Sequence, residues 1–345
     1  MSGTSLDGID LCEAEFKVED SKWSYEIIKA STFAYTEEWV KFLENAHHLS
    51  KNDIKLLDTK YTNFLSKVIL NFMTKPDEID FVCSHGHTIL HEPEKGITYQ
   101  IGNQPVLAEL INKTLICDFR TADVELGGQG APLVPIGDKL LFGEYDYCIN
   151  IGGFVNISFE NKNKRIAFDI CPANKILNLY AKQLGVDYDD KGQEASQGKC
   201  NIDLLNDLNS IGYYDQNPPK SLGVEWVEKE MLSILENYKI SIADKLNTLC
   251  KHIACQISNV IKTDSSKVLI TGGGAYHDCL IGCIRKKLDA SSIIIPEPEL
   301  IENKEALIFG LLGVLKFRGE NNVLKSVTGA KKNHSSGRQF TNTPH

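Results

Sequence analysis

The 345-residue chain is 42% hydrophobic and 24% charged, a composition typical of soluble globular proteins, and a chain of this length usually forms two domains. Its 37 basic and 46 acidic residues give a formal net charge of −9, which argues against a nucleic-acid binder with a broad basic surface. Apolar runs are far shorter than the ~20 residues of a membrane span, so we expect no membrane partner, and we expect no secretory signal near the start.

Short runs rich in β-branched and apolar residues alternate along the chain with longer segments of helical periodicity. The short runs predict strands at residues 10–16, 79–84, 113–118, 146–151, 155–159, 165–169, 267–271 and 291–295. The helical patterns are clearest at residues 53–73, 240–261 and 304–317. In the first of these, apolar residues such as Ile54, Leu57 and Tyr61 recur at three- and four-residue steps. This alternation of strands and helices predicts α/β layers.

A glycine-rich turn that leads into a strand occurs twice, at residues 2–8 and at Gly152-Gly153. This repetition predicts two similar domains that face each other across a cleft. We place residues 1–130 and 305–330 in the first domain and residues 131–304 in the second. The tail at residues 331–345 is rich in Ser, Asn, Thr and Lys, a composition that predicts disorder.

Ten cysteines occur without any C-x-x-C pair, and most of them lie in apolar segments such as residues 81–83 and 147–149. Zinc knuckles and redox pairs use that spacing, so its absence argues against both. Small buried thiols in a reducing compartment are expected rather than a disulfide framework. We therefore expect a cytoplasmic protein.

The opening turn has the residue types of a phosphate site. Gly3 and Gly8 allow close approach of the backbone, and backbone N–H groups can bind an anion. Thr4 and Ser5 add hydroxyl donors, and Asp7 could hold Mg²⁺ directly or through water. No Lys follows, so the turn is not the common phosphate-binding loop with a terminal Gly-Lys-Ser/Thr. A polar hairpin turn without a ligand is the alternative.

Two later glycine turns could serve the same nucleotide. Gly152-Gly153, followed by Asn156, lies between two predicted strands, and residues 272–274 lie between a strand and a helix. Ligands of α/β proteins bind at the carboxyl ends of strands, which is where the third turn stands. Tight packing of a strand on a helix would also favour glycine there. One nucleotide held between two domains explains the three turns together.

Other polar residues follow predicted strands. His85 follows the strand that ends at residue 84, where hydrogen bonding to a polar substrate is favoured over zinc binding. Arg120 and Asp123 begin a Gly- and Pro-rich loop that ends at residue 135, and a salt-bridged structural loop is the alternative to a ligand site. Asp169 ends a strand and could act as a general base or as a helix N-cap.

These motifs resemble, in the same order, those of the anhydro-N-acetylmuramic acid kinases, which belong to the actin/hexokinase/Hsp70 ATPase superfamily. The resemblance covers nearly the whole chain to residue 330, and its longest and most specific motif is the run at residues 118–135. The segments that carry it are residues 1–10, 84–86, 118–135, 150–156, 190–192, 218–221, 271–275, 304–306 and 327–330. It implies two duplicated actin-like (ribonuclease H-like) α/β domains with an interdomain cleft.

The resemblance also implies a defined reaction. The family uses ATP to open the 1,6-anhydro bridge of anhydro-N-acetylmuramic acid by hydrolysis and to phosphorylate O6. The product is N-acetylmuramic acid 6-phosphate, an intermediate of peptidoglycan recycling. Water attacks C1, so one base must activate it, while the phosphates need N–H donors and Mg²⁺. The implied partners are this sugar and ATP, and the oligomeric state stays open, with a homodimer as one alternative.

Carried over residue by residue, the resemblance assigns Asp169 as the catalytic base. It assigns to ATP and its phosphates Gly3, Thr4, Ser5, Leu6, Asp7, Gly8, Gly152, Gly153, Asn156, Gly272, Gly273 and Gly274. It assigns to the sugar His85, Arg120, Asp123 and Asn174. Mg²⁺ is expected at Asp7. Glu305 opens a helix near the cleft in this comparison, and an acid that interacts with the helix dipole is its alternative role.

The chain departs from the family pattern beside the base. The family has Asp-Thr-Gly-Pro-Gly-Asn there, whereas residues 169–174 read Asp-Ile-Cys-Pro-Ala-Asn, which changes hydrogen bonding and backbone freedom. His87 stands where the family has Gln, and Val224 where it has Arg. Only Met1 precedes the opening motif, so the first strand is expected to be short or absent.

Two other functions stay open at this point. A related sugar kinase that acts on another sugar would use the same nucleotide clamp. An ATP-binding protein with impaired catalysis that senses a wall fragment would fit the altered surroundings of Asp169. Release of ADP with and without the anhydro sugar distinguishes these alternatives.

Overall fold

The computed structural model describes residues 1–3, 6–262 and 265–341. The chain divides into two compact units, one of Met1–Leu141 with Asn303–His345 and one of Phe142–Glu302. The first boundary therefore lies after helix α5 (Pro135–Leu141) and not at residue 130. Gly137 of α5 explains why this helix stays with the first unit, since its Cα lies so close to the Ile308 side chain that a Cβ would overlap it.

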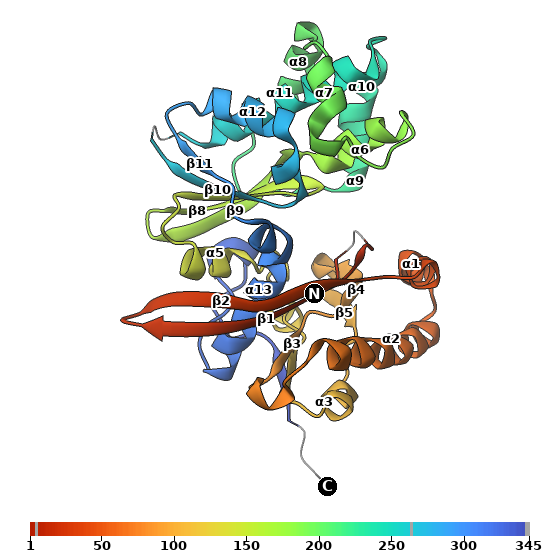
Figure 1. The fold of residues 1–345 in the computed structure, drawn as a ribbon, viewed down its shortest axis with the longest axis vertical. Helices are drawn as coiled ribbons and strands as arrows, with labels where there is room; N and C mark the ends of the chain where they lie inside the picture. Colours follow the sequence, from red (N-terminus) through yellow and green to blue (C-terminus); the bar gives the residue numbers. More distant parts are fainter. Residues whose placement is uncertain (4–5, 263–264, 342–345) are drawn as a thin grey trace. The chain divides into compact units, whose positions relative to one another are not determined.

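The first unit is mixed α/β and contains three small sheets. Its strands are β1 (Gly8–Glu19), β2 (Lys22–Ala34), β3 (Val82–Ser84), β4 (His87–Glu92), β5 (Ile97–Ile101), β6 (Leu115–Cys117) and β12 (Arg338–Phe340). They form an antiparallel β1-β2 pair, an antiparallel β4-β5 pair and a sheet of order β12-β6-β3 (Figure 1). Its helices are α1 (Glu37–Glu44), α2 (Lys51–Phe72), α3 (Val106–Ile111), α4 (Thr121–Glu125), α5, most of α13 (Pro298–Phe317) and α14 (Lys325–Thr328).

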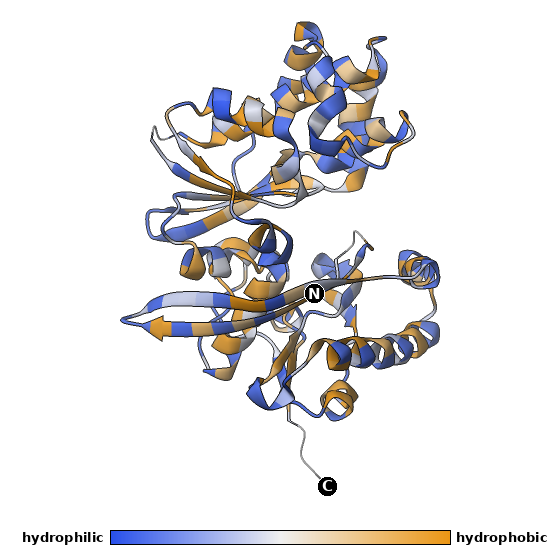
Figure 2. Cartoon of the chain, viewed as in Figure 1, coloured by the Kyte–Doolittle hydropathy of each residue, from blue (hydrophilic) through white to orange (hydrophobic). Residues whose placement is uncertain are grey.

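Helix α2 shows how the pattern of apolar residues builds this unit. Its N-cap Ser50 accepts a hydrogen bond from the Asp53 N–H, which satisfies one of the free amides at the helix start. Ile54, Leu57 and Tyr61 are buried, as their spacing predicts. Figure 2 shows apolar and polar residues alternating along the helix. The predicted helix at residues 53–73 is therefore confirmed.

The polar tail is ordered as far as residue 341, so the predicted disorder is wrong for residues 331–341. Strand β12 pairs antiparallel with β6, and the fully buried Ser336 donates a hydrogen bond from Oγ to the Phe119 carbonyl at 2.6 Å. The prediction from composition failed because the polar side chains of this segment find partners inside the first unit. Residues 342–345 lie outside the described part of the chain.

The second unit is a five-stranded mixed sheet of order β11-β10-β7-β8-β9. Its strands are β7 (Tyr147–Ile151), β8 (Phe154–Asn161), β9 (Lys164–Pro172), β10 (Lys267–Thr271) and β11 (Ser292–Ile294). β7, β10 and β11 are parallel, whereas β7, β8 and β9 form an antiparallel meander. The helices are α6 (Asn174–Lys182), α7 (Gln193–Gln197), α8 (Ile202–Asn209), α9 (Val224–Trp226), α10 (Ser233–Glu236), α11 (Ile242–Val260) and α12 (Asp278–Lys287).

Figure 1 shows the helices of the second unit gathered over one face of this sheet. Leu249, Ile253 and Ile257 of α11 belong to the same buried cluster as Ile149 and Val155 of the sheet. β7 and the centre of β10 are mainly apolar, as expected for strands buried between neighbours. The predicted helices at residues 240–261 and 304–317 correspond to α11 and α13, and every predicted strand overlaps an observed one.

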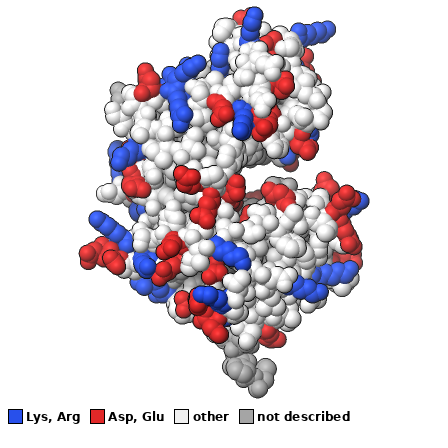
Figure 3. All heavy atoms as spheres, in the orientation of Figure 1, with Lys and Arg blue, Asp and Glu red and all other residues white. Residues whose placement is uncertain are grey.

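The surface agrees with the acidic, mixed composition. On the face drawn in Figure 3, Lys and Arg side chains are interspersed with Asp and Glu on both units. Among the described residues, no helix combines the length and apolar character needed to cross a bilayer.

Candidate active site

Asp169 lies near the end of strand β9, opposite Asn156 of β8, where a register shift between Val155 and Asn156 interrupts the ladder. The Asn156 amide donates a hydrogen bond to one Asp169 carboxylate oxygen, Oδ1. The backbone N–H of Leu222 donates to the other, Oδ2, at 2.9 Å. Both oxygens are therefore held in fixed positions. The N-cap of α6 is Ala173, so Asp169 does not cap that helix.

The backbone of Asp169 is held as firmly as its side chain. Its N–H donates to the Lys220 carbonyl at 3.2 Å, and its own carbonyl accepts the Tyr213 hydroxyl at 2.7 Å. Lys220 in turn donates from Nζ to the Tyr213 carbonyl at 3.0 Å, and its Nζ lies 4.5 Å from the centre of the Tyr213 ring. This network fixes the segment that presents the Leu222 N–H to the carboxylate.

Burial raises the pKa of Asp169 above the ordinary value for a carboxyl group. The hydrogen bonds from the Leu222 N–H and from Asn156 act in the opposite direction, because they stabilise the charged form. The pKa remains raised because desolvation is the largest effect. A carboxylate with a raised pKa is a stronger base than an exposed one, and its immobilised oxygens suit proton abstraction from a bound water.

Replacing Asn156 should move the pH dependence of this base. Loss of one hydrogen bond to the charged form raises the pKa further, so Asn156→Leu is expected to shift the acid limb of kcat/KM to higher pH by roughly one unit. The pH–rate profiles of the two proteins measure the shift. Asn161→Leu, at the far end of strand β8, serves as the control and should leave the acid limb in place. If Asn156→Leu had the same acid limb as the wild type, the hydrogen bond between Asn156 and Asp169 would not determine the pKa seen in the profile.

The glycines of the second glycine turn, Gly152 and Gly153, are not required by packing. Gly152 and Gly153 have no positive φ. A Cβ on Gly152 would lie 3.4 Å from Asn150 Nδ2, and one on Gly153 would lie 3.9 Å from the Lys175 Cβ, which are ordinary contact distances. A side chain would therefore fit within the folded unit. Its absence is explained if a ligand must approach this backbone.

The third turn contains two glycines that packing requires and one that it does not. Gly272 has a φ of +82°, and a Cβ there would lie 2.7 Å from Asn150 Oδ1. Gly274 lies so close to Ile151 that a Cβ would overlap its side chain. Packing therefore requires glycine at these two positions, as the alternative interpretation of this turn suggests. Gly273 differs, because the nearest atom to a Cβ there is Asn174 Nδ2 at 3.6 Å.

Asn174 lies between these two turns. Its backbone N–H donates to the Gly152 carbonyl at 3.1 Å, and its Nδ2 donates to the Ile151 carbonyl at 3.4 Å. The turns follow β7 and β10, two neighbouring parallel strands, so both stand at the same edge of the sheet. The second unit thus brings together the predicted residues of its two glycine turns with Asn174. It also brings Asn156 onto Asp169.

In the first unit the structure pairs His85 with Arg120. Arg120 donates from Nε to His85 Nε2 at 2.9 Å and from Nη1 to the Gly130 carbonyl at 2.6 Å. Because His85 Nε2 accepts this bond, Nδ1 carries the proton and donates to the Gly86 carbonyl at 2.9 Å. Burial, with the neighbouring Arg120 charge, lowers the pKa of His85 well below its ordinary value. A neutral histidine therefore orients the guanidinium.

Asp123 is fully buried, and both its carboxylate oxygens are occupied. Oδ2 accepts the Gly130 N–H at 2.7 Å, and Oδ1 accepts the Thr328 hydroxyl at 2.7 Å. His334 Nε2 lies 3.6 Å from Oδ1. Asp123 therefore shapes the loop that carries Arg120, and a direct contact of its carboxylate with the sugar stays a prediction.

The opening turn is described in part. Leu6 has a φ of +59°, and its N–H donates to the Gly3 carbonyl at 3.5 Å. Gly8 begins strand β1, and a Cβ there would lie 2.5 Å from the Phe33 carbonyl oxygen, so pairing with β2 requires this glycine. The Asp7 side chain is exposed. Thr4 and Ser5 lie outside the described residues.

Glu305 does not open a helix, because α13 begins at Pro298. The effect of the helix dipole is confined to the first turn, so the alternative role predicted for this acid does not apply. Its side chain is accessible to solvent. Desolvation by the atoms packed around the carboxyl group nevertheless raises the pKa of Glu305, and the positive charge of Arg120 partly opposes this shift. Glu305 therefore lies within electrostatic reach of the His85–Arg120 pair.

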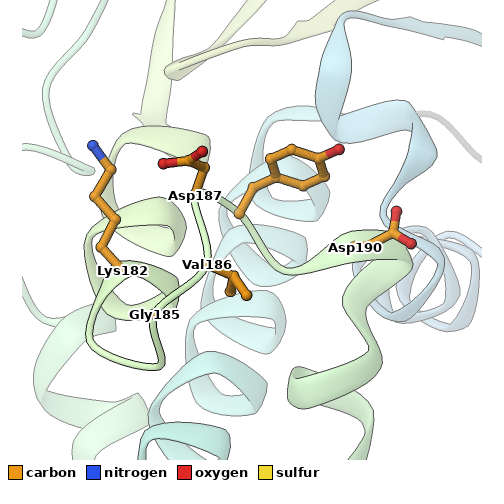
Figure 4. Close-up of a pocket in the computed structure, with 6 residues that line it drawn as sticks. Lys182, Gly185, Val186, Asp187 and Asp190 are labelled. Atoms are coloured by element: carbon orange, nitrogen blue, oxygen red, sulfur yellow. The ribbon is translucent and has the colours of Figure 1, made fainter.

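An open cavity of about 610 Å³ lies elsewhere in the second unit (Figure 4). It is lined by Lys182, Gly185, Val186, Asp187, Tyr188 and Asp190. None of the predicted catalytic or ligand-binding residues is among them, so this cavity is separate from the residues around Asp169.

Comparison with known proteins tests the family resemblance seen in the sequence motifs. A family model described as anhydro-N-acetylmuramic acid kinase matches residues 1–342. The chain belongs to the anhydro-N-acetylmuramic acid kinase family. Among its relatives, the enzyme of this name from Francisella tularensis subsp. novicida is 31% identical and the one from Clostridioides difficile is 33% identical. Each alignment covers 96% of this chain and 94% of the relative.

The relative of the same name from Hydrogenovibrio crunogenus is 31% identical, over 98% of this chain and 95% of its own length. Among solved structures, component A of the Acidaminococcus fermentans (R)-2-hydroxyglutaryl-CoA dehydratase aligns with 87% of this chain and 93% of its own, at 17% identity and a TM-score of 0.42. The family assignment therefore rests on the sequence matches, which span nearly the whole length of both partners.

Proposed function

We propose that the protein is an ATP-dependent kinase that hydrolyses the 1,6-anhydro bridge of anhydro-N-acetylmuramic acid and phosphorylates O6. The product would be N-acetylmuramic acid 6-phosphate, which enters peptidoglycan recycling. Membership of the anhydro-N-acetylmuramic acid kinase family over residues 1–342 supports this function. The observation that carries it in the structure is the Asp169 carboxylate, which has two N–H donors and pairs with strand β8, directly after the turn at Gly152 and Gly153 where packing does not require glycine.

Asp169 is proposed to accept a proton from the water that attacks C1. Its oxygens are fixed by Asn156 and Leu222, so the base needs little reorganisation as the reaction proceeds. Bond formation from water to C1 breaks the C1–O6 bond, and the released O6 becomes the nucleophile for the γ-phosphoryl group. Arg120, oriented by His85, is proposed to bind the sugar.

The backbone N–H groups at Gly153 and Gly273 are proposed to bind the nucleotide, with the opening turn on the phosphates. The Gly152 N–H donates to the Phe154 carbonyl at 3.1 Å, so Gly152 is proposed to contribute by allowing the nucleotide to approach the backbone closely. Mg²⁺ would neutralise charge on the transferred phosphoryl group, and the exposed Asp7 would hold it directly or through water. We propose that the two units are duplicated actin-like domains that take ATP between them. The Asn156 amide donates one N–H to Asp169, so its contribution to phosphate binding would be through the second N–H of the same amide.

The altered residues beside Asp169 do not disturb the carboxylate. Ile170 and Cys171 are buried in the core of the second unit, and the donors to the carboxylate come from Asn156 and Leu222. Ala173 retains a backbone hydrogen bond from its N–H to the Gly153 carbonyl at 2.8 Å. These contacts favour an active base over an impaired ATP-binding sensor.

Reaction in ¹⁸O-labelled water tests the hydrolytic step. O6 is locked in the bridge of the substrate, so water must supply the new oxygen at C1. We expect one ¹⁸O at C1 and none in the P–O–C6 linkage, measured by mass spectrometry after a quench that outruns anomeric exchange. A substrate with a free 6-hydroxyl serves as the control, because ordinary phosphorylation introduces no solvent oxygen. Label absent from C1, or present in the phosphate linkage, would leave the ordinary sugar kinase.

A further inference from the structure

The loop that carries Arg120 is held by residues from the other end of the chain. We call residues 118–130 the substrate loop and residues 328–340 the C-terminal strap. Asn322, fully buried, fixes the strap to helix α13, because its Nδ2 donates to the carbonyls of Leu312 and Ser336, each at 2.9 Å. Its Oδ1 accepts the Ser336 N–H at 2.7 Å. Strand β12, at the end of the strap, then pairs with β6, which leads directly into the substrate loop.

Two contacts from the strap hold the start of the substrate loop. The Ser336 hydroxyl donates to the Phe119 carbonyl at 2.6 Å, and Arg338 Nε lies 3.1 Å from Asp118 Oδ2. Asp118 has a φ of +59°, which is unfavourable for a residue other than glycine and persists only where neighbours enforce it. Thr121 also donates from its hydroxyl to Asp118 Oδ1, at 2.5 Å. The backbone immediately before Arg120 is thus set by the strap.

Thr328 holds the far end of the same loop. Its hydroxyl donates to Asp123 Oδ1 at 2.7 Å, and its carbonyl accepts the Gln129 N–H at 2.8 Å. The same Asp123 carboxylate also contacts Gly130, because its Oδ2 accepts the Gly130 N–H at 2.7 Å. The Gly130 carbonyl in turn accepts Arg120 Nη1 at 2.6 Å. A continuous chain of hydrogen bonds therefore joins Thr328 to the guanidinium.

We propose that the C-terminal strap sets the position of the Arg120 guanidinium for the anhydro sugar, with Thr328 and Arg338 as positioning residues. This inference rests on the proposed function, because Arg120 is assigned to the sugar there. Neither residue touches substrate; each acts through the substrate loop. We therefore expect changes in the strap to alter kcat/KM for the sugar and to leave binding of the nucleotide by the second unit unchanged.

Arg338 allows the role to be tested with little risk to the fold. Its side chain is 63% exposed, so the substitution leaves no cavity in the core, and thermal unfolding shows whether loss of the positive charge beside the 15% exposed Asp118 changes stability. Arg318, which pairs with Glu320 elsewhere in the first unit and is 47% exposed, is a matched control. Arg338→Gln and Arg318→Gln each remove a guanidinium group and its ion pair with a carboxylate. Only Arg338→Gln breaks a contact with the substrate loop.

The experiment measures steady-state kinetics for the anhydro sugar and for ATP. Misplacement of an oriented group by about 1 Å can cost a factor of 10², so we expect Thr328→Val to lower kcat/KM for the sugar by about 10- to 100-fold. Arg338→Gln is expected to lower it by about 3- to 10-fold, with KM for ATP within about twofold of wild type. Thr328→Ser keeps the hydroxyl and should restore kcat/KM, and Arg318→Gln should match wild type.

Equal effects of Arg338→Gln and Arg318→Gln on kcat/KM for the sugar would overturn the proposal, as would a parallel rise in KM for ATP. Hydrogen exchange gives a second readout that needs no turnover. The Gly130 amide should exchange faster in Thr328→Val than in Thr328→Ser, since the Asp123 carboxylate that it contacts loses its anchor. Inactivity of the wild-type protein on the anhydro sugar would contradict the proposed function, whereas unchanged exchange at Gly130 would contradict the strap.

Discussion

Asp169→Asn is expected to lower the rate of sugar phosphorylation by about 10²- to 10⁴-fold, the usual contribution of a general base. The amide has the size of the carboxylate but cannot accept a proton from water. The local hydrogen bonds can survive, because the Asn156 amide can rotate to offer its oxygen, and Leu222 can donate to the remaining carbonyl oxygen. ADP release coupled to mass spectrometry of the sugar product measures the loss. Binding of ATP, followed by calorimetry, should be retained.

A matched control separates loss of the base from a change in net charge. Asp187, which lines the open cavity of the second unit, is exposed, and Asp187→Asn removes the same charge away from the catalytic residues. This variant should turn over at the wild-type rate. If Asp169→Asn retained sugar phosphorylation, the role of base would pass to another carboxylate, and Glu305 or Asp7 would be the next to test.

Gly153→Val is expected to weaken MgATP binding by about 10- to 100-fold, which corresponds to the loss of one or more hydrogen bonds to charged phosphate oxygens. Gly153 is exposed, and its surroundings leave room for a Cβ within the folded unit. The valine side chain would therefore occupy the space through which a nucleotide reaches the backbone. Isothermal calorimetry measures the affinity, and thermal unfolding should show a transition close to that of the wild type.

Two further glycine variants make this result interpretable. Gly212→Val places the same side chain where no other atom lies within 4 Å, and it should change neither affinity nor stability. Gly274→Ala should behave in the opposite way and lower the unfolding temperature, because its Cβ would overlap the Ile151 side chain. Normal ATP affinity in Gly153→Val would mean that the second turn does not bind the nucleotide.

Much of the fold was predictable because its signals are local. The apolar stripe of α2 predicts a helix and the β-branched run of β10 predicts a strand, each from neighbouring residues alone. β12 was missed because two polar residues and one phenylalanine in a hydrophilic tail give no such signal, and its partner β6 is distant in sequence. The start of α13 was misplaced because the polar run from Glu302 to Glu305 separates Leu300 and Ile301 from the apolar pattern that follows.

The candidate site was predictable in its residue types but not in its connections. Asp169 could be identified as a carboxylate at the end of a strand, yet one of its two donors is the backbone N–H of Leu222, 53 residues away. A backbone group leaves no mark on the sequence, so no motif could reveal it. The bond between Thr328 and Asp123 spans 205 residues, and its role emerges only once the chain has folded. Glycine turns were easier to find, although only structure distinguishes the open positions from the packed ones.

The division of the chain has a consequence for its synthesis. The second unit is continuous in sequence, whereas the first closes only when the segment from Asn303 onward joins Met1–Leu141. During synthesis on the ribosome, the second unit can therefore complete its hydrophobic core before the first unit can. Strand β6 pairs with β12, which is synthesised only after the whole second unit, so this edge of β6 remains unpaired during that interval. Unpaired edges recruit other strands, which makes this interval the period of greatest exposure to aggregation and to chaperone binding.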